Sequence, residues 1–213
     1  TFGLFMQPMG LHHGWSRDVF SMAFAFQNIT WGLGAIAAGM MADKFGSART
    51  VALAAGLYAI GLIGTRLAST ELELYLTAGV LVGLGQAGTT FAVILPVIAR
   101  SVPVSYRSTA MGIAGAGGSL GQFLVVPTGQ VLIDTLNWTG AYWVLSLFLA
   151  AAIPLAWYLR GKPDNGGIQL SMRQAINQAL THPSFHFLFW SYFVCGFHTA
   201  FITLHLPAFA IDE

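Results

Sequence analysis

The 213-residue sequence carries very little charge. Charged residues make up 8% of it, and nine Lys and Arg against eight Asp and Glu leave a formal net charge of +1. Soluble proteins carry about 25% charged residues, so this chain lacks the charged shell of a soluble core. It also lacks the basic stripe of a nucleic-acid-binding protein. With 55% hydrophobic residues, the composition predicts a polytopic membrane protein.

Cysteine and catalytic motifs are also scarce. The one cysteine, Cys195, excludes an intramolecular disulfide framework and a cysteine-rich zinc site, and the histidines lack ligand spacing, so we expect no metal. Residues 83–88 spell Gly-x-Gly-x-x-Gly, but they lie inside an uncharged segment and not between a strand and a helix. No nucleophile–base pair, paired carboxylates or phosphate loop appears. We therefore expect no enzyme and no cofactor.

The charges fall in clusters that are separated by six long uncharged segments. A membrane-spanning helix needs about 20 apolar residues, and the one shorter segment can be extended by outward-reaching arginines at both ends. The six segments therefore predict six transmembrane helices. They cover residues 19–42, 50–65, 74–99, 108–133, 135–159 and 184–211.

The order of these segments predicts a fragment of a larger bundle. The apolar residues 1–12 are too short to span a bilayer, so we expect the tail of helix 1 followed by helices 2 to 7. The expected domains are an N-terminal transmembrane half over residues 1–159, a cytoplasmic linker over 160–181, and helix 7, the start of a C-terminal half, over 182–213. Within the linker, Ser171 is expected to cap a short amphipathic helix.

Lysine and arginine are distributed unevenly between the two sides. Seven lie in the loops after helices 2, 4 and 6, whereas only Arg17 and Arg66 lie on the opposite side. The positive-inside rule places the first set in the cytoplasm. We expect a multi-pass protein of a bacterial cytoplasmic membrane, with the lipid bilayer as its partner.

The loop after helix 2 carries the most specific motif. Residues 39–49 follow the pattern Gly-x-x-x-Asp-Lys-x-Gly-x-x-Arg. This pattern resembles the 2–3 loop motif of the major facilitator superfamily, and the helix order and the long loop after helix 6 extend the resemblance over nearly the whole chain. The resemblance implies an all-α polytopic membrane protein with the major facilitator fold. This chain would then hold the N-terminal six-helix half plus the first helix of the second half.

The motif residues have expected conformational roles. A glycine before the loop admits close helix packing, and one inside it permits a tight turn. A carboxylate at the membrane edge needs a compensating partner, and the resemblance implies that Asp43 contacts the opposing half and a nearby arginine. The alternative is that the loop charges only obey the positive-inside rule. The residues of this motif, with a candidate partner from the 4–5 loop, are Gly39, Asp43, Lys44, Gly46, Arg49 and Arg107.

Several polar side chains lie inside the uncharged segments, where polar groups are costly and usually face the bundle interior. Threonines can bond to their own helix backbone, whereas amides either line a substrate path or pair between helices. Two histidines of helix 7 lie seven residues apart. Either they carry a proton in coupled transport, or they stay neutral and form hydrogen bonds within the bundle. The substrate-path candidates are Gln27, Asn28, Gln86, Thr89, Thr90, Gln122, His198 and His205.

Helix 5 contains a small-xxx-small pair, Gly117 and Gly121. Such pairs let helix backbones approach closely. We expect this pair to pack against another helix, either against the second half as the two halves rock or in a static seam.

A narrower resemblance concerns the monocarboxylate and oxalate–formate branch of the superfamily. It rests on residues 14–17 and 24–28 in the first part of helix 2, 106–112 entering helix 5, and 196–198 through 205–207 in helix 7. It implies a secondary transporter of a small organic anion such as a monocarboxylate, coupled to protons or a counter-anion. Because the complete spans contain no Lys or Arg to offset an anion, other hypotheses remain open: a drug or neutral-solute exporter, a non-transporting polytopic protein, or a channel.

Overall fold

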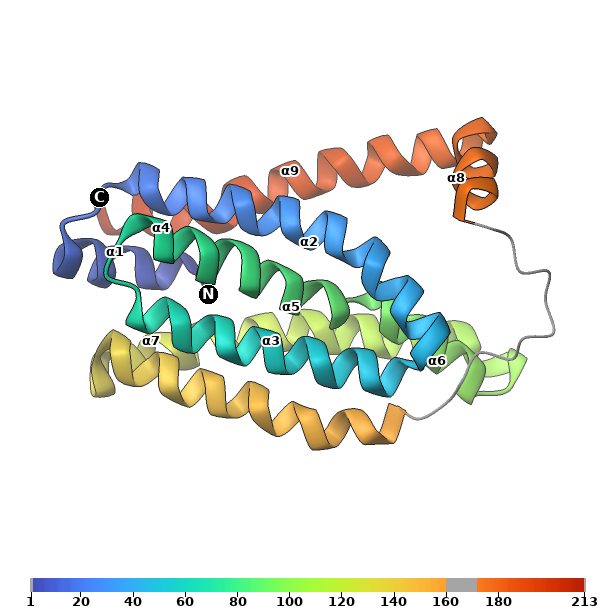
Figure 1. Cartoon of the computed structure of the whole chain (residues 1–213), viewed down its shortest axis with the longest axis horizontal. Coiled ribbons are helices and arrows are strands. Elements are labelled where there is room, and N and C mark those ends of the chain that lie inside the picture. The colour runs from blue at the N-terminus through green and yellow to red at the C-terminus, as the bar shows by residue number, and fades with distance from the viewer. Residues whose placement is uncertain (1, 160–171, 213) are drawn as a thin grey trace. The chain divides into compact units, whose positions relative to one another are not determined.

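The computed structural model describes residues 2–159 and 172–212, with the side chains of 172, 173, 175 and 203–212 excepted. The described residues are almost entirely helical and contain no strand (Figure 1). The chain divides into two compact units near residue 163. The all-α fold predicted from the sequence is confirmed.

The first unit is a bundle and the second a pair of helices. The bundle consists of α1 (Phe2–His13), α2 (Arg17–Phe45), α3 (Ser47–Leu67), α4 (Glu71–Leu74), the π-helix η1 (Tyr75–Leu81), α5 (Val82–Gly88), α6 (Phe91–Ser101), η2 (Val104–Tyr106), α7 (Arg107–Leu155) and η3 (Ala156–Leu159). The second unit holds α8 (Met172–Thr181) and α9 (Pro183–Asp212).

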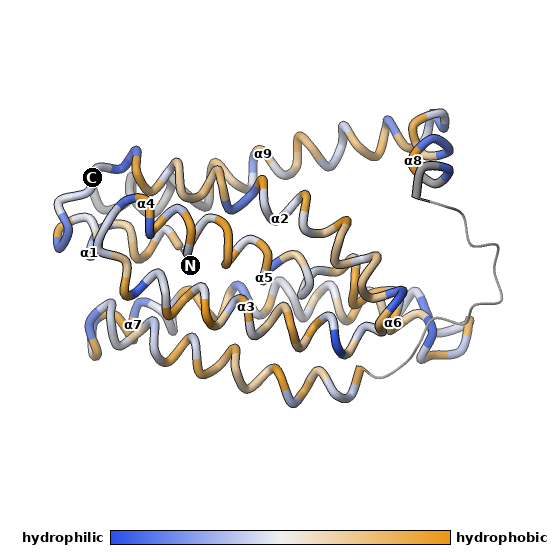
Figure 2. The backbone as a smooth tube through the Cα atoms, in the orientation of Figure 1, coloured by the Kyte–Doolittle hydropathy of each residue, from blue (hydrophilic) through white to orange (hydrophobic). Residues whose placement is uncertain are grey.

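Among the described residues, five helical stretches are long and apolar enough to cross a membrane. The longest, Val104–Leu159, has 56 residues, more than twice the roughly 20 that one crossing needs. It holds two of the six predicted spans, because the chain reverses direction at Asn137, whose φ of 61° and ψ of 168° are not helical (Figure 1). The predicted connection over 134–137 is thus reduced to a turn centred on one residue. Hydrophobic residues follow the helix shafts, and hydrophilic ones gather toward their ends (Figure 2).

The fourth predicted span is not one regular helix, which corrects the sequence expectation. It begins with a turn of α4, continues as the π-helix η1 and α5, and breaks before α6. At the break Thr90 is extended, with φ −78° and ψ 166°, and its carbonyl accepts from the N–H groups of Val93 and Ile94 at 3.1 and 3.2 Å. The helix therefore restarts at Thr90. Hydropathy does not reveal this break, since one threonine changes the mean of a long apolar segment very little.

Helix α5 lies unusually close to α2 and α3. A Cβ atom built on Gly85 would lie 2.6 Å from the backbone N of Tyr58 in α3, and one on Gly83 would lie 2.7 Å from the carbonyl oxygen of Gln27 in α2. Only glycine permits these approaches. The Gly-x-Gly-x-x-Gly pattern is therefore a helix-packing pattern in this structure.

We expect Gly85→Ala to lower the free energy of unfolding by about 1–3 kcal/mol, the usual cost of overpacking a tight interface. The backbone of α3 is the obstacle, so no side-chain movement relieves it. Thermal unfolding of the purified protein in detergent measures the effect. Gly56→Ala in α3 is the matched control, since a Cβ there meets no described atom within 4 Å. Equal unfolding temperatures for the two variants would contradict the prediction.

Candidate functional site

A chain of polar side chains connects three helices inside the bundle. The Nε2 of Gln27 in α2 donates to the Oε1 of Gln86 in α5 at 2.9 Å, and the Nε2 of Gln86 donates to the hydroxyl of Tyr58 in α3 at 3.3 Å. Gln27 is only 6% exposed. The structure thus brings together two of the predicted substrate-path residues and adds a third group.

Sequence reasoning missed Tyr58, because tyrosine counts as an aromatic residue in an apolar run. The signal was present, since the hydroxyl of a buried tyrosine usually finds a hydrogen-bond partner. Tyr58 lies within the span Ser47–Leu67, whose interior has few other polar side chains. An uncharged span with a central tyrosine therefore indicates a polar contact to a neighbouring helix.

One atom of the Gln27–Gln86–Tyr58 chain lacks a hydrogen-bond partner. The Oε1 of Gln27 is buried and has no hydrogen-bond partner among the described residues. A buried polar atom without a partner costs free energy, so this oxygen can accept a hydrogen bond from a water or a solute donor. The site therefore offers neutral hydrogen-bonding groups and no charge.

A further contact holds α2 against η1. The hydroxyl of Thr30 donates to the carbonyl of Gly79 at 2.8 Å, and it also lies 2.9 Å from the carbonyl of Phe26 in its own helix. A π-helix shifts the direction of its carbonyls relative to an α-helix, and here one of them meets a side chain of α2. The polar contacts thus follow the same interface as the glycines.

Within the part of the chain that the structure describes, three predicted substrate-path residues make only local hydrogen bonds. The amide of Asn28 donates to the carbonyl of Phe24 at 2.8 Å. The hydroxyl of Thr89 donates to the carbonyl of Gln86 at 3.1 Å, and that of Thr90 to the carbonyl of Ala87 at 2.9 Å. These side chains satisfy themselves within their own segment, and they do not join the Gln27–Gln86–Tyr58 chain.

The remaining candidates lie elsewhere. Gln122 is exposed on α7 and has no hydrogen-bond partner in the part of the chain that the structure describes. In α9 the Nδ1 of His198 lies 3.0 Å from the carbonyl of Val194, one turn earlier. The side chain of His205 lies outside the described residues. Their proposed roles in a substrate path stay predictions.

The turn of the 2–3 loop has the geometry that its sequence predicts. Gly46 separates α2 from α3 with φ 93° and ψ 148°, which residues with a side chain rarely adopt. Its N–H donates to the carbonyl of Ala42 at 3.0 Å, and it is buried. The predicted tight turn is confirmed.

The charged residues around this turn are exposed. Asp43, Lys44, Arg49 and Arg107 all have exposed side chains, and no ion pair joins them to one another across residues 2–159. The ammonium group of Lys44 lies 5.3 Å from the centre of the Phe45 ring. The conformational latch therefore stays a prediction that concerns contacts beyond this half.

Three glycines with predicted packing roles face open space. A Cβ atom built on Gly39, Gly117 or Gly121 meets no described atom within 4 Å. Close packing among the described residues occurs at other glycines, those of α5 among them. Packing at Gly39, Gly117 and Gly121 against a second half stays a prediction.

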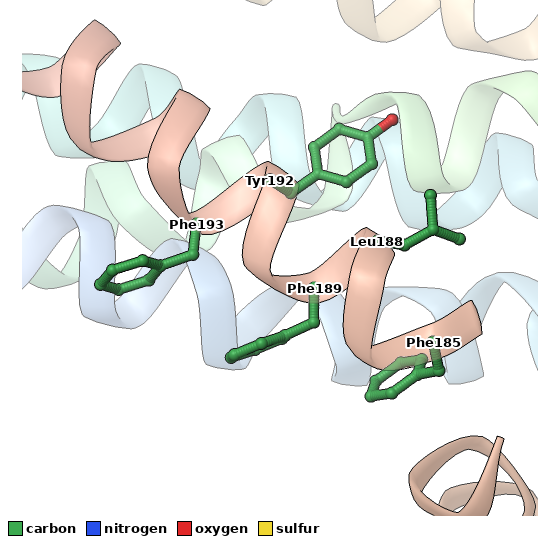
Figure 3. A pocket seen from close by; sticks show the side chains of 5 residues that line it. All are labelled: Phe185, Leu188, Phe189, Tyr192 and Phe193. Atoms are coloured by element: carbon green, nitrogen blue, oxygen red, sulfur yellow. The ribbon is translucent and has the colours of Figure 1, made fainter. Parts of the chain in front are cut away.

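Helix α9 carries an aromatic pocket that the sequence analysis did not single out (Figure 3). Phe185, Phe189 and Phe193 are spaced four residues apart, so they share one face of the helix. Leu188 and Tyr192 complete the pocket. The only polar side-chain atom of the lining is the hydroxyl of Tyr192 (Figure 3). The described residues hold no group of three or more His, Cys, Asp or Glu that could bind a metal ion.

Comparisons with known proteins give a consistent family. The model of the Major Facilitator Superfamily matches residues 1–213. Human monocarboxylate transporter 12 is 35% identical over 96 residues, or 44% of this chain and 18% of that protein. Chicken (Gallus gallus) monocarboxylate transporter 3 is 36% identical over 107 residues, or 50% of this chain and 19% of that protein. The probable anion transporter 6, chloroplastic, of Arabidopsis thaliana is 25% identical over 142 residues, or 66% of this chain and 27% of that protein. The matches thus span about a fifth to a quarter of each relative.

We expect Gln86→Leu to destabilise the protein by about 1–3 kcal/mol, because it leaves a buried amide and a phenol without a partner. Thermal unfolding measures this loss. Gln122→Leu is the control, since Gln122 is exposed and its replacement should change stability by less than about 0.5 kcal/mol. Adding Gln27→Leu to the Gln86 variant should recover part of the loss. A fully additive double variant would show that the two amides do not interact.

Proposed function

Because the chain belongs to the Major Facilitator Superfamily, we propose that it forms part of a secondary transporter that moves a small solute by alternating access. In this mechanism two halves rock about a site near the middle of the bilayer. The chain is an integral, multi-pass membrane protein. We expect neither enzymatic chemistry nor a cofactor in this role, and the energy would come from a solute or ion gradient.

An open pair of glycines on α7 carries this proposal. Gly117 and Gly121 are four residues apart, so they share one face of the helix, and a Cβ built on either meets no described atom within 4 Å. The glycines of α5, in contrast, are tightly packed. Small residues on an open face allow a second helical unit to approach and slide. This pair therefore supports a moving contact between halves.

A small organic anion such as a monocarboxylate is the proposed substrate. The relatives named as monocarboxylate transporters support this class. An anion inside a bilayer needs a nearby cation, and the uncharged segments of this chain contain no Lys or Arg. That cation would come from another part of the transporter. Coupling to a proton or to a counter-anion belongs to the same proposal.

A neutral solute is the second candidate, and the polar chain favours it. Gln27, Gln86 and Tyr58 provide hydrogen bonds without charge. A drug or neutral-solute exporter would use such groups directly.

The predicted location in a bacterial cytoplasmic membrane stays a prediction, and the relatives compared above are animal and plant proteins.

Counterflow in proteoliposomes tests the transport proposal and both substrate classes. Vesicles that contain the full-length protein are loaded with an unlabelled monocarboxylate such as lactate, and labelled lactate is added outside. Transient accumulation of label requires alternating access and excludes a channel. Accumulation with an uncharged solute instead would favour the second candidate. No accumulation with either class would contradict the transport proposal.

We expect Asp43→Asn to lower the counterflow rate about tenfold, because the loss of a coupling contact between states is worth roughly 1–3 kcal/mol. The unfolding temperature should stay unchanged, since Asp43 is exposed and has no ion pair among the described residues. Asp18→Asn, an exposed acid in the first turn of α2, is the control. Equal rates for both variants would show that Asp43 has no special role.

A further inference from the structure

Arg66 and Trp143 form a pair at the end of the bundle opposite the 2–3 loop. Arg66 lies in the last turn of α3, which packs against α7. Its guanidinium carbon is 5.2 Å from the centre of the Trp143 ring of α7. A cation over an indole face is attracted by the ring quadrupole. The tryptophan therefore holds the guanidinium in a defined place.

The positive charge of Arg66 is not offset within the described part of the chain. The Nε of Arg66 is buried without a hydrogen-bond partner. The nearest acids along the chain are engaged elsewhere: the Oε2 of Glu73 accepts from the N–H groups of Ser69 and Thr70 at 2.7 and 3.2 Å, and the Oε2 of Glu71 lies 3.5 Å from the Tyr75 hydroxyl. A partly buried guanidinium that lacks a hydrogen-bond acceptor is stabilised when an oxyanion binds to it.

The surroundings of the pair match the border between headgroups and acyl chains. Arg66 is one residue from the end of the candidate span Ser47–Leu67. Trp143 is 44% exposed, and Leu147, one turn further into the span, is 65% exposed. Tryptophan and arginine are common where a helix leaves the hydrocarbon core. The pair thus places a charged donor directly beside exposed apolar surface.

We propose that Arg66 and Trp143 bind the phosphate of a membrane phospholipid, whose acyl chain lies along the exposed side chains of α7. The guanidinium offers a planar fork of donors, which suits two phosphate oxygens. A free carboxylate or phosphate shares this oxyanion chemistry. Such an anion would leave the neighbouring apolar surface uncovered, whereas a phospholipid would contact both the guanidinium and the apolar side chains of α7.

Native mass spectrometry of the full-length protein with added dioleoylphosphatidylglycerol tests the proposal. We expect Arg66→Gln to weaken lipid binding about tenfold, because a charge-assisted hydrogen bond is lost. Trp143→Leu should weaken it about threefold, the effect of losing one exposed cation–π contact. Arg66→Lys keeps the charge without the fork and should fall between wild type and Arg66→Gln. Arg17→Gln, which removes the other basic residue of this side, is the matched control and should bind as wild type does.

Equal lipid affinity of wild type and Arg66→Gln would overturn the proposal. So would a loss of the same size in Arg17→Gln, which would indicate only a general charge effect. If Arg66→Gln does not fold, the Arg66→Lys and Trp143→Leu variants decide by the same comparison. Inorganic phosphate is the second probe. If it displaces the lipid at millimolar concentration from wild type, the site belongs to a free anion, and the lipid assignment is wrong.

Discussion

The close approach of α5 to α2 and α3 is the constraint on which the rest of the bundle depends. Inside a bilayer the hydrophobic effect does not drive helices together, so association depends on packing and on hydrogen bonds. Gly83 and Gly85 bring the backbones together, and Gln86, the residue after Gly85, reaches both neighbouring helices. A side chain at either glycine would therefore separate the polar groups as well as the helices.

The polar chain is neutral throughout, and this determines what it can do. Two amides and a phenol tolerate a low-dielectric interior far better than a charge would. They specify the register of three helices, and they leave one amide oxygen, that of Gln27, free to accept a bond. The interior of this half thus contributes hydrogen bonds, while charges occupy only its ends. Any charge recognition of a solute falls to other parts of the protein.

Sequence patterns predicted the helices and the turn at Gly46 well, because hydrophobic length, charge clusters and a glycine in a short motif are local signals. They did not predict the break at Thr90, since a single threonine changes the mean hydropathy of a long apolar segment very little. They pointed to Gln27 and Gln86 but not to Tyr58, which depends on which helices are neighbours. They gave no packing role to Gly83 and Gly85 of α5, because the spacing of small residues does not say which face of a helix is covered.

The reversal at Asn137 has a consequence for how the bundle can move. The two crossings of α7 are joined by a single non-helical residue, so no flexible loop lies between them. A shift of one crossing along its axis therefore displaces the adjoining end of the other. In any rocking motion of the bundle, the two crossings move as one antiparallel pair.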